Sequence, residues 1–305
     1  MTIWPTANTR PTVSTLNSYD GRIRANAAII PAGQGGSISA FATNDTEIIL
    51  DVNGYFVQDS SALVYYPLTP CRVADTREGT GDLGGPALSA GQERTLPLRT
   101  SACNIPAEAQ AYSLNYTVVP KQSLGYLTSW PTGQSRPVAS TLNAPTGAVT
   151  ANAAVVPAGT NGSVDVFASD DTDLVIDING YFAPPGNGGL SLYAVTPCRV
   201  FDTRTTGNGQ PFNGALDVNV KGSECKLPAN VQAYALNATV IPSEHLGYLS
   251  LWPSGAKQPL VSTLNSQDGA VTANMAVITT QGGSVSSFVT DTTHLILDVT
   301  GYFAP

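Results

Sequence analysis

The chain has 305 residues, of which 14 are basic and 22 acidic, giving a net charge of −8. Basic residues are too few to form a positive surface, so nucleic acid and anionic membrane surfaces are poor partners. The 22 prolines and 29 glycines argue against long helices, and no apolar run is long enough to span a membrane.

Residues 1–58 carry only the back half of a longer repeat. The opening MTIWP aligns with YLTSWP and YLSLWP further along the chain, but no cysteine-bearing front segment precedes it within this sequence. A half module leaves a strand edge unpaired and an apolar face uncovered, and both invite pairing with another chain. We therefore expect association to take place through this segment.

One phrase closes three segments of the chain, as ILDVNGYF, VIDINGYF and LILDVTGYF. Its aromatic pairs stand at Tyr55–Phe56, Tyr181–Phe182 and Tyr302–Phe303, spaced 126 and then 121 residues apart. Self-similarity at a fixed period indicates an array of like modules. After the half module at 1–58, two complete modules span 59–184 and 185–305, and each GYF phrase is expected to be a closing strand.

Each complete module contains a shorter repeat, with asparagine, proline, glycine and an aromatic residue at steps of five. In the second module its two copies are Asn115, Pro120, Gly125, Trp130 and Asn152, Pro157, Gly162, Phe167. Short segments rich in Val, Ile, Thr and Tyr between Pro, Gly and Asn are typical of strands and turns. We predict an all-β fold without significant helix. Each module is a duplicated meander, and a sandwich with the paired meanders as facing sheets is favoured over a small barrel.

The strand phrase DLVIDINGYF alternates with a period of two. Leu174, Ile176 and Ile178 share one face, while Val175 and Asp177 share the other. Only the first face is expected to be buried against a second layer.

The cysteines fall at matching places in the two complete modules. We predict the disulfides Cys71–Cys103 and Cys198–Cys225. A metal site would need more ligands than two cysteines per module and two histidines in the chain can supply. Disulfides indicate an oxidising compartment, so an extracellular or cell-surface location is expected.

The phrases PCRVADTR and PCRVFDTR each carry an Arg–Asp–Arg set. These residues are Arg72, Asp75, Arg77 and Arg199, Asp202, Arg204, and the closing strands add Asp51, Asp177 and Asp298. They could bind an acidic ligand, but the presence of the set in every copy favours structural ion pairs. The turn SDDTD at Ser169–Asp173 resembles a calcium loop. Its counterparts lose carboxylates, which favours a hairpin turn over a metal site.

Aromatic residues gather near a proline in each module. Trp4, Trp130 and Trp252 each precede a proline, and Tyr126 and Tyr248 lie four residues before two of them. They could form sugar-stacking platforms at strand ends. Trp130 holds the position of Phe167 in the other half-repeat, which favours an anchor in a core or interface.

No catalytic arrangement stands out in the sequence. It contains no G-x-S-x-G elbow, H-E-x-x-H pair or phosphate-binding glycine loop. The N-x-S/T matches at Asn115 and Asn237 lie inside predicted strands, so we interpret them as part of the repeat rather than as glycosylation sites. No cofactor is expected.

The phrases PCRVADTR, LNYTVVPKQSLGYLTSWP, STLNAPTGAVTANAAVVPAG and DLVIDINGYF together resemble a repeat of large secreted bacterial proteins. That repeat occurs in tandem, often beside other extracellular domains, in soil and environmental lineages. The resemblance covers nearly the whole chain and implies an exported, disulfide-bearing β module. It assigns no catalytic or binding residue.

These observations predict a non-enzymatic extracellular structural protein, an adhesive or filament-forming array of β modules. In its sharper form, copies associate head to tail through the incomplete first module, because a heterologous contact need not close. The alternative is a carbohydrate-binding array that recognises cell-surface or matrix glycans. Nucleic acid and membrane insertion are not expected.

Overall fold

Strands joined by turns make up the chain, as its Val, Ile, Thr and Tyr content predicts. The computed structural model describes residues 1–206 and 208–305. Within these ranges the helical segments are the short 3₁₀ turns Gln34–Gly36, Leu98–Thr100 and Thr160–Gly162, and no helix is long and apolar enough to cross a membrane. The predicted all-β fold is confirmed.

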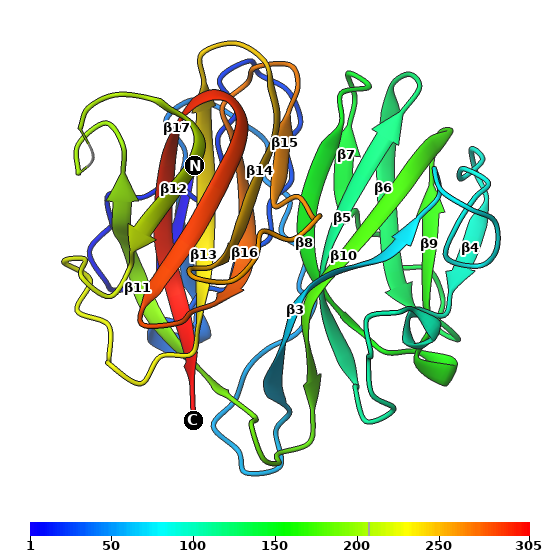
Figure 1. The fold of residues 1–305 in the computed structure, drawn as a ribbon, viewed down its shortest axis with the longest axis horizontal. Coiled ribbons are helices and arrows are strands. Elements are labelled where there is room, and N and C mark those ends of the chain that lie inside the picture. Colours follow the sequence, from blue (N-terminus) through cyan, green and yellow to red (C-terminus); the bar gives the residue numbers. More distant parts are fainter. Residues whose placement is uncertain (207) are drawn as a thin grey trace.

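The second module is a sandwich of two antiparallel four-stranded sheets (Figure 1). One sheet has the order β3-β10-β5-β8 and the other β4-β9-β6-β7. The strands are β3 Val64–Asp75, β4 Glu93–Leu96, β5 Ala111–Pro120, β6 Leu124–Pro131, β7 Leu142–Ala144, β8 Thr150–Pro157, β9 Val164–Ala168 and β10 Thr172–Ala183. The inner faces bury one apolar core that includes Leu114, Leu127 and Leu174. Each such side chain stabilises the fold by about 1.5–3 kcal/mol.

The third module has the same plan with one difference. Its strands are β11 Ser191–Asp202, β12 Phe212–Asn219, β13 Ala233–Pro242, β14 Leu246–Pro253, β15 Leu264–Ser266, β16 Thr272–Thr279 and β17 Ser284–Ala304. β17 pairs with β12 and β14 along its first part and with β11 and β13 along its second. It therefore corresponds to β9 and β10 joined, and it links both layers into one nearly closed, barrel-like sheet.

Each half-repeat contributes strands to both layers. β5 and β6 are consecutive in the chain but belong to opposite sheets, and so do β8 and β9. The prediction that paired meanders form the facing sheets is therefore wrong. β5 and β8 end at prolines, which cannot extend a ladder because they lack an N–H group. The turn at Ser169–Asp173 likewise carries the chain from β9 across to β10, so it is a turn but not the predicted hairpin.

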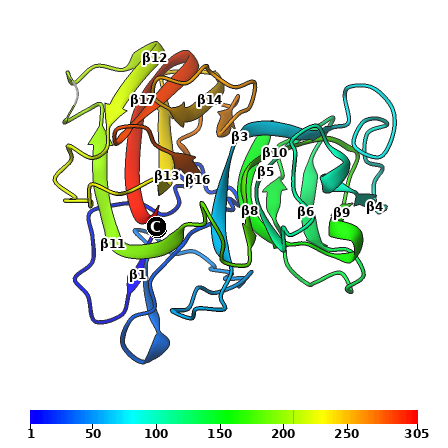
Figure 2. The ribbon, with the colours of Figure 1, turned by 60° about the horizontal axis from the view of Figure 1, so that its bottom comes forward.

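The first module holds a small two-stranded sheet of β1, Thr2–Pro5, and β2, Ile38–Phe41. By repeat position these match β6 and β9 of the second module. Figure 2 shows this blue segment beside both sandwiches. Its closing phrase, ILDVNGYF at 49–56, forms no strand, because residues 1–58 include no counterpart of β3 or β5, which flank β10. The expectation of a closing strand is wrong for this copy.

Both predicted disulfides are confirmed. Cys71 bonds Cys103 and Cys198 bonds Cys225, with Cα–Cα distances of 5.8 Å and 5.9 Å. Each bond ties the first strand of its module to the loop that precedes the central strand, β5 or β13. The front segment of each complete module is thus closed on itself.

Candidate assembly site at the incomplete module

Three equivalent asparagines lie where the modules meet. The side-chain Oδ1 of each accepts a hydrogen bond from the backbone N–H that follows the equivalent asparagine of another module. The donors and acceptors are Met275 to Asn26 at 3.0 Å, Ala27 to Asn152 at 3.1 Å, and Ala153 to Asn274 at 2.9 Å. The three bonds run in one direction around a ring. The modules are therefore arranged about an internal threefold axis.

Apolar residues of the GYF phrases pack around the same axis. The Tyr65 ring lies 5.3 Å from Phe182 and 4.6 Å from Phe303, and Phe56 lies 5.7 Å from Phe182. Ile29, Val155 and Val277, which share one position of the repeat, join this cluster. The closing phrases thus supply the apolar part of the junction, in addition to closing the sandwiches.

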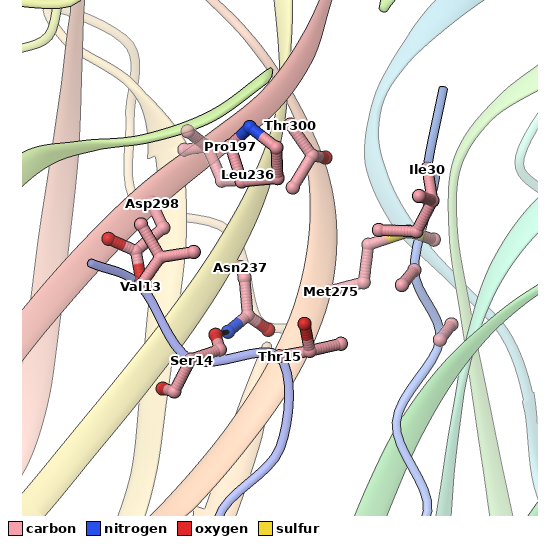
Figure 3. A pocket seen from close by; sticks show the side chains of 12 residues that line it. Val13, Ser14, Thr15, Ile30, Pro197, Leu236, Asn237, Met275, Asp298 and Thr300 are labelled. Carbon is pink, nitrogen blue, oxygen red and sulfur yellow. Dashed lines mark hydrogen bonds between the residues drawn. The ribbon is translucent and has the colours of Figure 1, made fainter. Parts of the chain in front are cut away.

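Two further asparagines, Asn115 and Asn237, extend the junction. Asn274 donates from Nδ2 to Oδ1 of Asn115 on β5, and Asn26 donates in the same way to Asn237 on β13, both at 2.8 Å. In return Asn237 donates to the Ser14 carbonyl at 2.7 Å, and Figure 3 shows Asn237 facing Ser14 of the first module. These strand asparagines are therefore recognition groups between modules.

Asn152 is the exception in this arrangement. Its Nδ2 donates to the Thr141 carbonyl at 2.7 Å, as its equivalents do to Thr15 and Thr263. Among the described residues it has no asparagine acceptor, because that acceptor would stand on a front strand of the first module. The second set therefore has two asparagine pairs instead of three, and the place beside Asn152 is empty.

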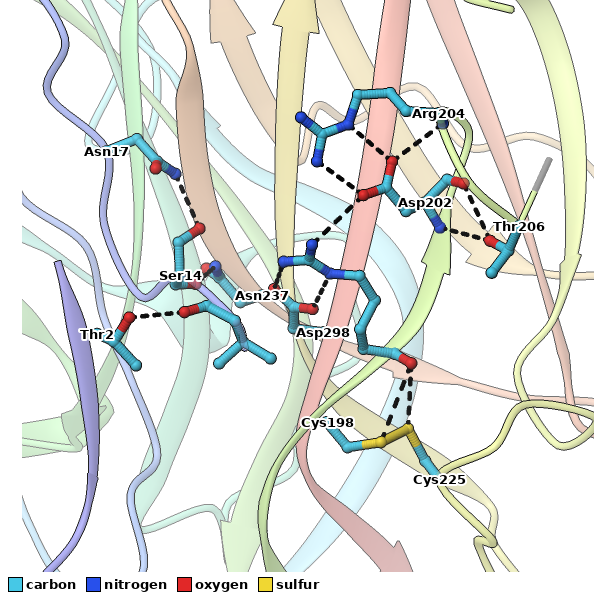
Figure 4. A network of polar contacts seen from close by, with 12 residues as sticks. Thr2, Ser14, Asn17, Cys198, Asp202, Arg204, Thr206, Cys225, Asn237 and Asp298 are labelled. Carbon is cyan, nitrogen blue, oxygen red and sulfur yellow. Dashed lines mark hydrogen bonds and ion pairs between the residues drawn. A yellow bond between two sulfur atoms is a disulfide. The ribbon is translucent and has the colours of Figure 1, made fainter. Parts of the chain in front are cut away.

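The Arg–Asp sets make contacts of one kind in both complete modules. Arg72 binds Asp177 through Nε and Nη2, at 2.9 and 3.3 Å, and reaches Asp75 through Nη1 at 3.1 Å. Arg77 binds Asp75 at 2.8 and 2.6 Å. The third module repeats this with Arg199, Asp202, Arg204 and Asp298. Figure 4 shows that copy above the Cys198–Cys225 bond.

Electrostatics bind these groups into a unit. Burial raises the pKa of Asp177 and Asp298, although the partner arginine acts in the opposite direction. Burial also acts to raise the pKa of Asp75, but hydrogen bonds from Arg77 outweigh it and the pKa is lowered. A buried carboxylate without its cation is strongly destabilising. The geometry therefore fits the structural role over an acidic-ligand site.

The outer face of β10 is not exposed, contrary to expectation. Val175 and Asp177 keep 3% and 4% of their surface. Arg72 covers Asp177 from its own module. Ser262 of the third module lies beside it, and its carbonyl accepts a hydrogen bond at 2.8 Å from Asn115, the residue that pairs with Asp177 on β5. Packing between modules, which a single-module pattern does not encode, buries this face.

In the first module the equivalent position is exposed rather than buried. Asp51, the counterpart of Asp177, is exposed and has no ion pair within the described part of the chain. The stretch 47–57, here called the uncovered segment, is exposed throughout. Its apolar members are Ile48, Ile49, Leu50, Val52, Tyr55, Phe56 and Val57, with Ile49, Val52 and Tyr55 at 85%, 86% and 85% exposure.

The tryptophans close the turns that follow them. The indole N–H of Trp4, Trp130 and Trp252 donates to the carbonyl four residues later, at 3.0, 3.0 and 3.1 Å. Trp130 and Trp252 are buried, with 3% and 6% exposure, and Tyr126 and Tyr248 pack against phenylalanine rings of their own modules. This arrangement favours anchors over sugar platforms.

Cavities lie where modules meet. The one in Figure 3 separates Ser14 and Thr15 from Met275 and measures about 10 Å³, the room that one water needs. Another, of about 230 Å³, lies between Pro67–Pro70 and the Trp252–Pro253 turn. It marks where the first strand of one module passes the tryptophan turn of the next.

The acidic turn Ser169–Asp173 serves the backbone. Asp170 accepts from the Gly125 N–H at 2.9 Å, and Asp171 accepts from the Ala90 N–H at 2.7 Å. Within residues 1–206 and 208–305, no group of three or more His, Cys, Asp or Glu is placed to hold a metal ion.

The central role of the asparagines was not predicted. Asn115 and Asn237 stood out only as sequons inside strands, although every half-repeat of the chain begins with an asparagine. An asparagine on a predicted buried strand needs a partner for both ends of its amide. That requirement is the feature of the sequence that indicates a bonding role for these asparagines.

No known protein family matches the chain, and no curated protein does either. The solved structures to which it is similar include the major capsid protein P2 from bacteriophage PM2. The identity is 10% over 79% of this chain and 97% of that chain, with a TM-score of 0.20. Similarity at this level does not establish a shared fold.

We expect Asn274→Ala to lower the free energy of unfolding by about 1 kcal/mol more than Asn152→Ala. Both substitutions orphan a backbone N–H of another module, but only Asn274 also serves Asn115, and one hydrogen bond contributes about that amount. Urea unfolding of the two variants side by side measures the difference. Equal midpoints would contradict the ring geometry.

Arg72→Met is expected to destabilise the second module by about 3 kcal/mol, because it leaves the buried Asp177 carboxylate without its cation. The control is Glu93→Gln, which removes the exposed pair of Glu93 with Arg136 and should change stability by less than about 0.5 kcal/mol. Chemical denaturation compares both variants. A small effect of Arg72→Met would favour a ligand site over a structural one.

Proposed function

We propose that the protein is a non-enzymatic extracellular structural protein, adhesive or filament-forming, that assembles through its incomplete first module. The observation that supports this is the uncovered segment, a stretch with the sequence of a strand whose seven apolar side chains are exposed to solvent. Exposed apolar surface of this extent marks interaction sites, and an unpaired strand sequence pairs readily with another polypeptide.

The internal threefold packing supports a structural role. Polar side chains that elsewhere form ligand or catalytic sites serve here as contacts within and between modules, as with Asn274 and Arg72. Two disulfides are compatible with an extracellular location. A structural role requires stable, repeated contacts and no single reactive centre.

In the filament-forming version, the first module of one molecule docks on a neighbouring molecule. Such a contact joins two different surfaces and need not close, so it extends into a chain. We expect the weight-average mass of the purified protein to rise with concentration. Light scattering across a dilution series, together with negative-stain microscopy, measures this.

Matched variants distinguish this contact from nonspecific association through exposed apolar residues. Replacing Ile49, Val52 and Tyr55 by serine should abolish the concentration dependence. Val138 and Leu260 are 105% and 93% exposed but lie in other modules. Replacing both by serine should leave the concentration dependence unchanged. A wild-type chain that stays monomeric at all concentrations would rule out the self-assembling version.

A further inference from the structure

The complete modules define what the first module lacks. β10 lies between β3 and β5, and the second part of β17 lies between β11 and β13. The uncovered segment has the same phrase with neither neighbour. It therefore offers two free strand edges and the face that its neighbours would share.

Three positions lack a partner that the equivalent positions of the complete modules have. Two of them lie on the uncovered segment. Asp51 stands where Asp177 and Asp298 each bind an arginine of the front strand. A Cβ added to Gly180 would lie 2.3 Å from the Tyr65 ring of the front strand, whereas one added to Gly54 would meet nothing within 4 Å.

The third such position lies on another module. Asn152 of the second module lacks the acceptor that Asn274 finds in Asn115 and Asn26 finds in Asn237. All three missing partners correspond to residues of the same missing segment, although the positions belong to two different modules. One occupant would satisfy them together.

We propose that the first module is completed by a front segment of this same repeat, supplied by polypeptide outside residues 1–305. It places a strand like β3 on one side of the uncovered segment and a strand like β5 on the other. This inference rests on the proposed role of the first module as the assembly site, and it names the partner.

Copies of residues 1–305 have no free front segment to donate. Each chain has three back halves and two front segments. Both front segments are paired in their own modules and closed by disulfides. Even if copies exchanged strands, two front segments per chain could not cover three back halves. One back half per chain would stay open.

The contacts between neighbouring modules also indicate where the occupant would run. The first strand of the second module passes the Trp252 turn of the third. The first strand of the third passes the first module, where Asn8 donates to Thr196 at 3.2 Å. Following the same direction around the axis, the occupant runs beside the Trp130 turn of the second module. An arginine for Asp51, an asparagine for Asn152 and an aromatic ring over Gly54 define its chemistry.

The test joins a second copy of residues 60–126 directly to Met1, which corresponds to Leu127 in the repeat. Hydrogen exchange followed by mass spectrometry reads the amides of residues 47–57. In the chimera we expect their exchange to slow by at least about 100-fold, because paired strands protect amides. A second arm adds the oxidised 60–126 polypeptide to the 305-residue chain in solution.

Matched variants make the test specific. Asp51→Asn and Gly54→Ala should be neutral in the 305-residue chain, where both sites are exposed. In the chimera each should reduce the protection, since Asp51 then faces an arginine and Gly54 an aromatic ring. Unchanged exchange in both arms overturns the proposal.

The outcomes also separate this inference from self-assembly. Protection in the chimera with a monomeric 305-residue chain supports the front segment and rules out self-assembly. Concentration-dependent protection in the 305-residue chain alone, with no added protection from the graft, shows a second copy on the segment and overturns the inference.

Discussion

The structure depends on one constraint: an asparagine amide buried between modules must satisfy both its carbonyl and its amino group. Asn274 meets it with the Ala153 N–H on one side and with Asn115 and Thr263 on the other. Because these partners come from different parts of the chain, the modules are not independent beads. Each one forms part of the binding site for the next.

This constraint explains how half a module stays ordered. The strand-like segment around Asn26 is held by Asn237 and Met275 of the third module and by Asn152 of the second. The apolar cluster at the axis adds Ile29 and Phe56. Arg22 and Asn8 add contacts with Asp268 and Thr196 of the third module. The uncovered segment contacts a neighbour through Phe56, but its side chains remain exposed.

Much of this could be predicted from the sequence, because the repeat presents the same features in several copies. The GYF phrases predicted an array of modules, and the equivalent places of Cys71 and Cys198 predicted the disulfide pairs that the structure contains. The layer assignment of strands could not be read, since the period of two is the same for a hairpin and for a chain that crosses a sandwich. The fusion of two strands in β17 was hidden for the same reason.

The contacts between modules were beyond the sequence pattern. Alternation predicted an exposed outer face for Val175 and Asp177, because a pattern within one strand reports only the layers of its own module. Their burial arises from packing about the axis. The empty place beside Asn152 is defined by the equivalent places beside Asn26 and Asn274, which Asn237 and Asn115 fill.

Small-angle X-ray scattering of an asparagine-ring variant tests the central claim most directly. The account predicts a compact chain, with a radius of gyration of about 20 Å, that expands when Asn26, Asn152 and Asn274 are all replaced by alanine. The control replaces Asn143 and Asn265, which bond within their own modules, and should stay compact. An unchanged radius in the triple variant would contradict the claim that these side chains hold the three modules about one axis.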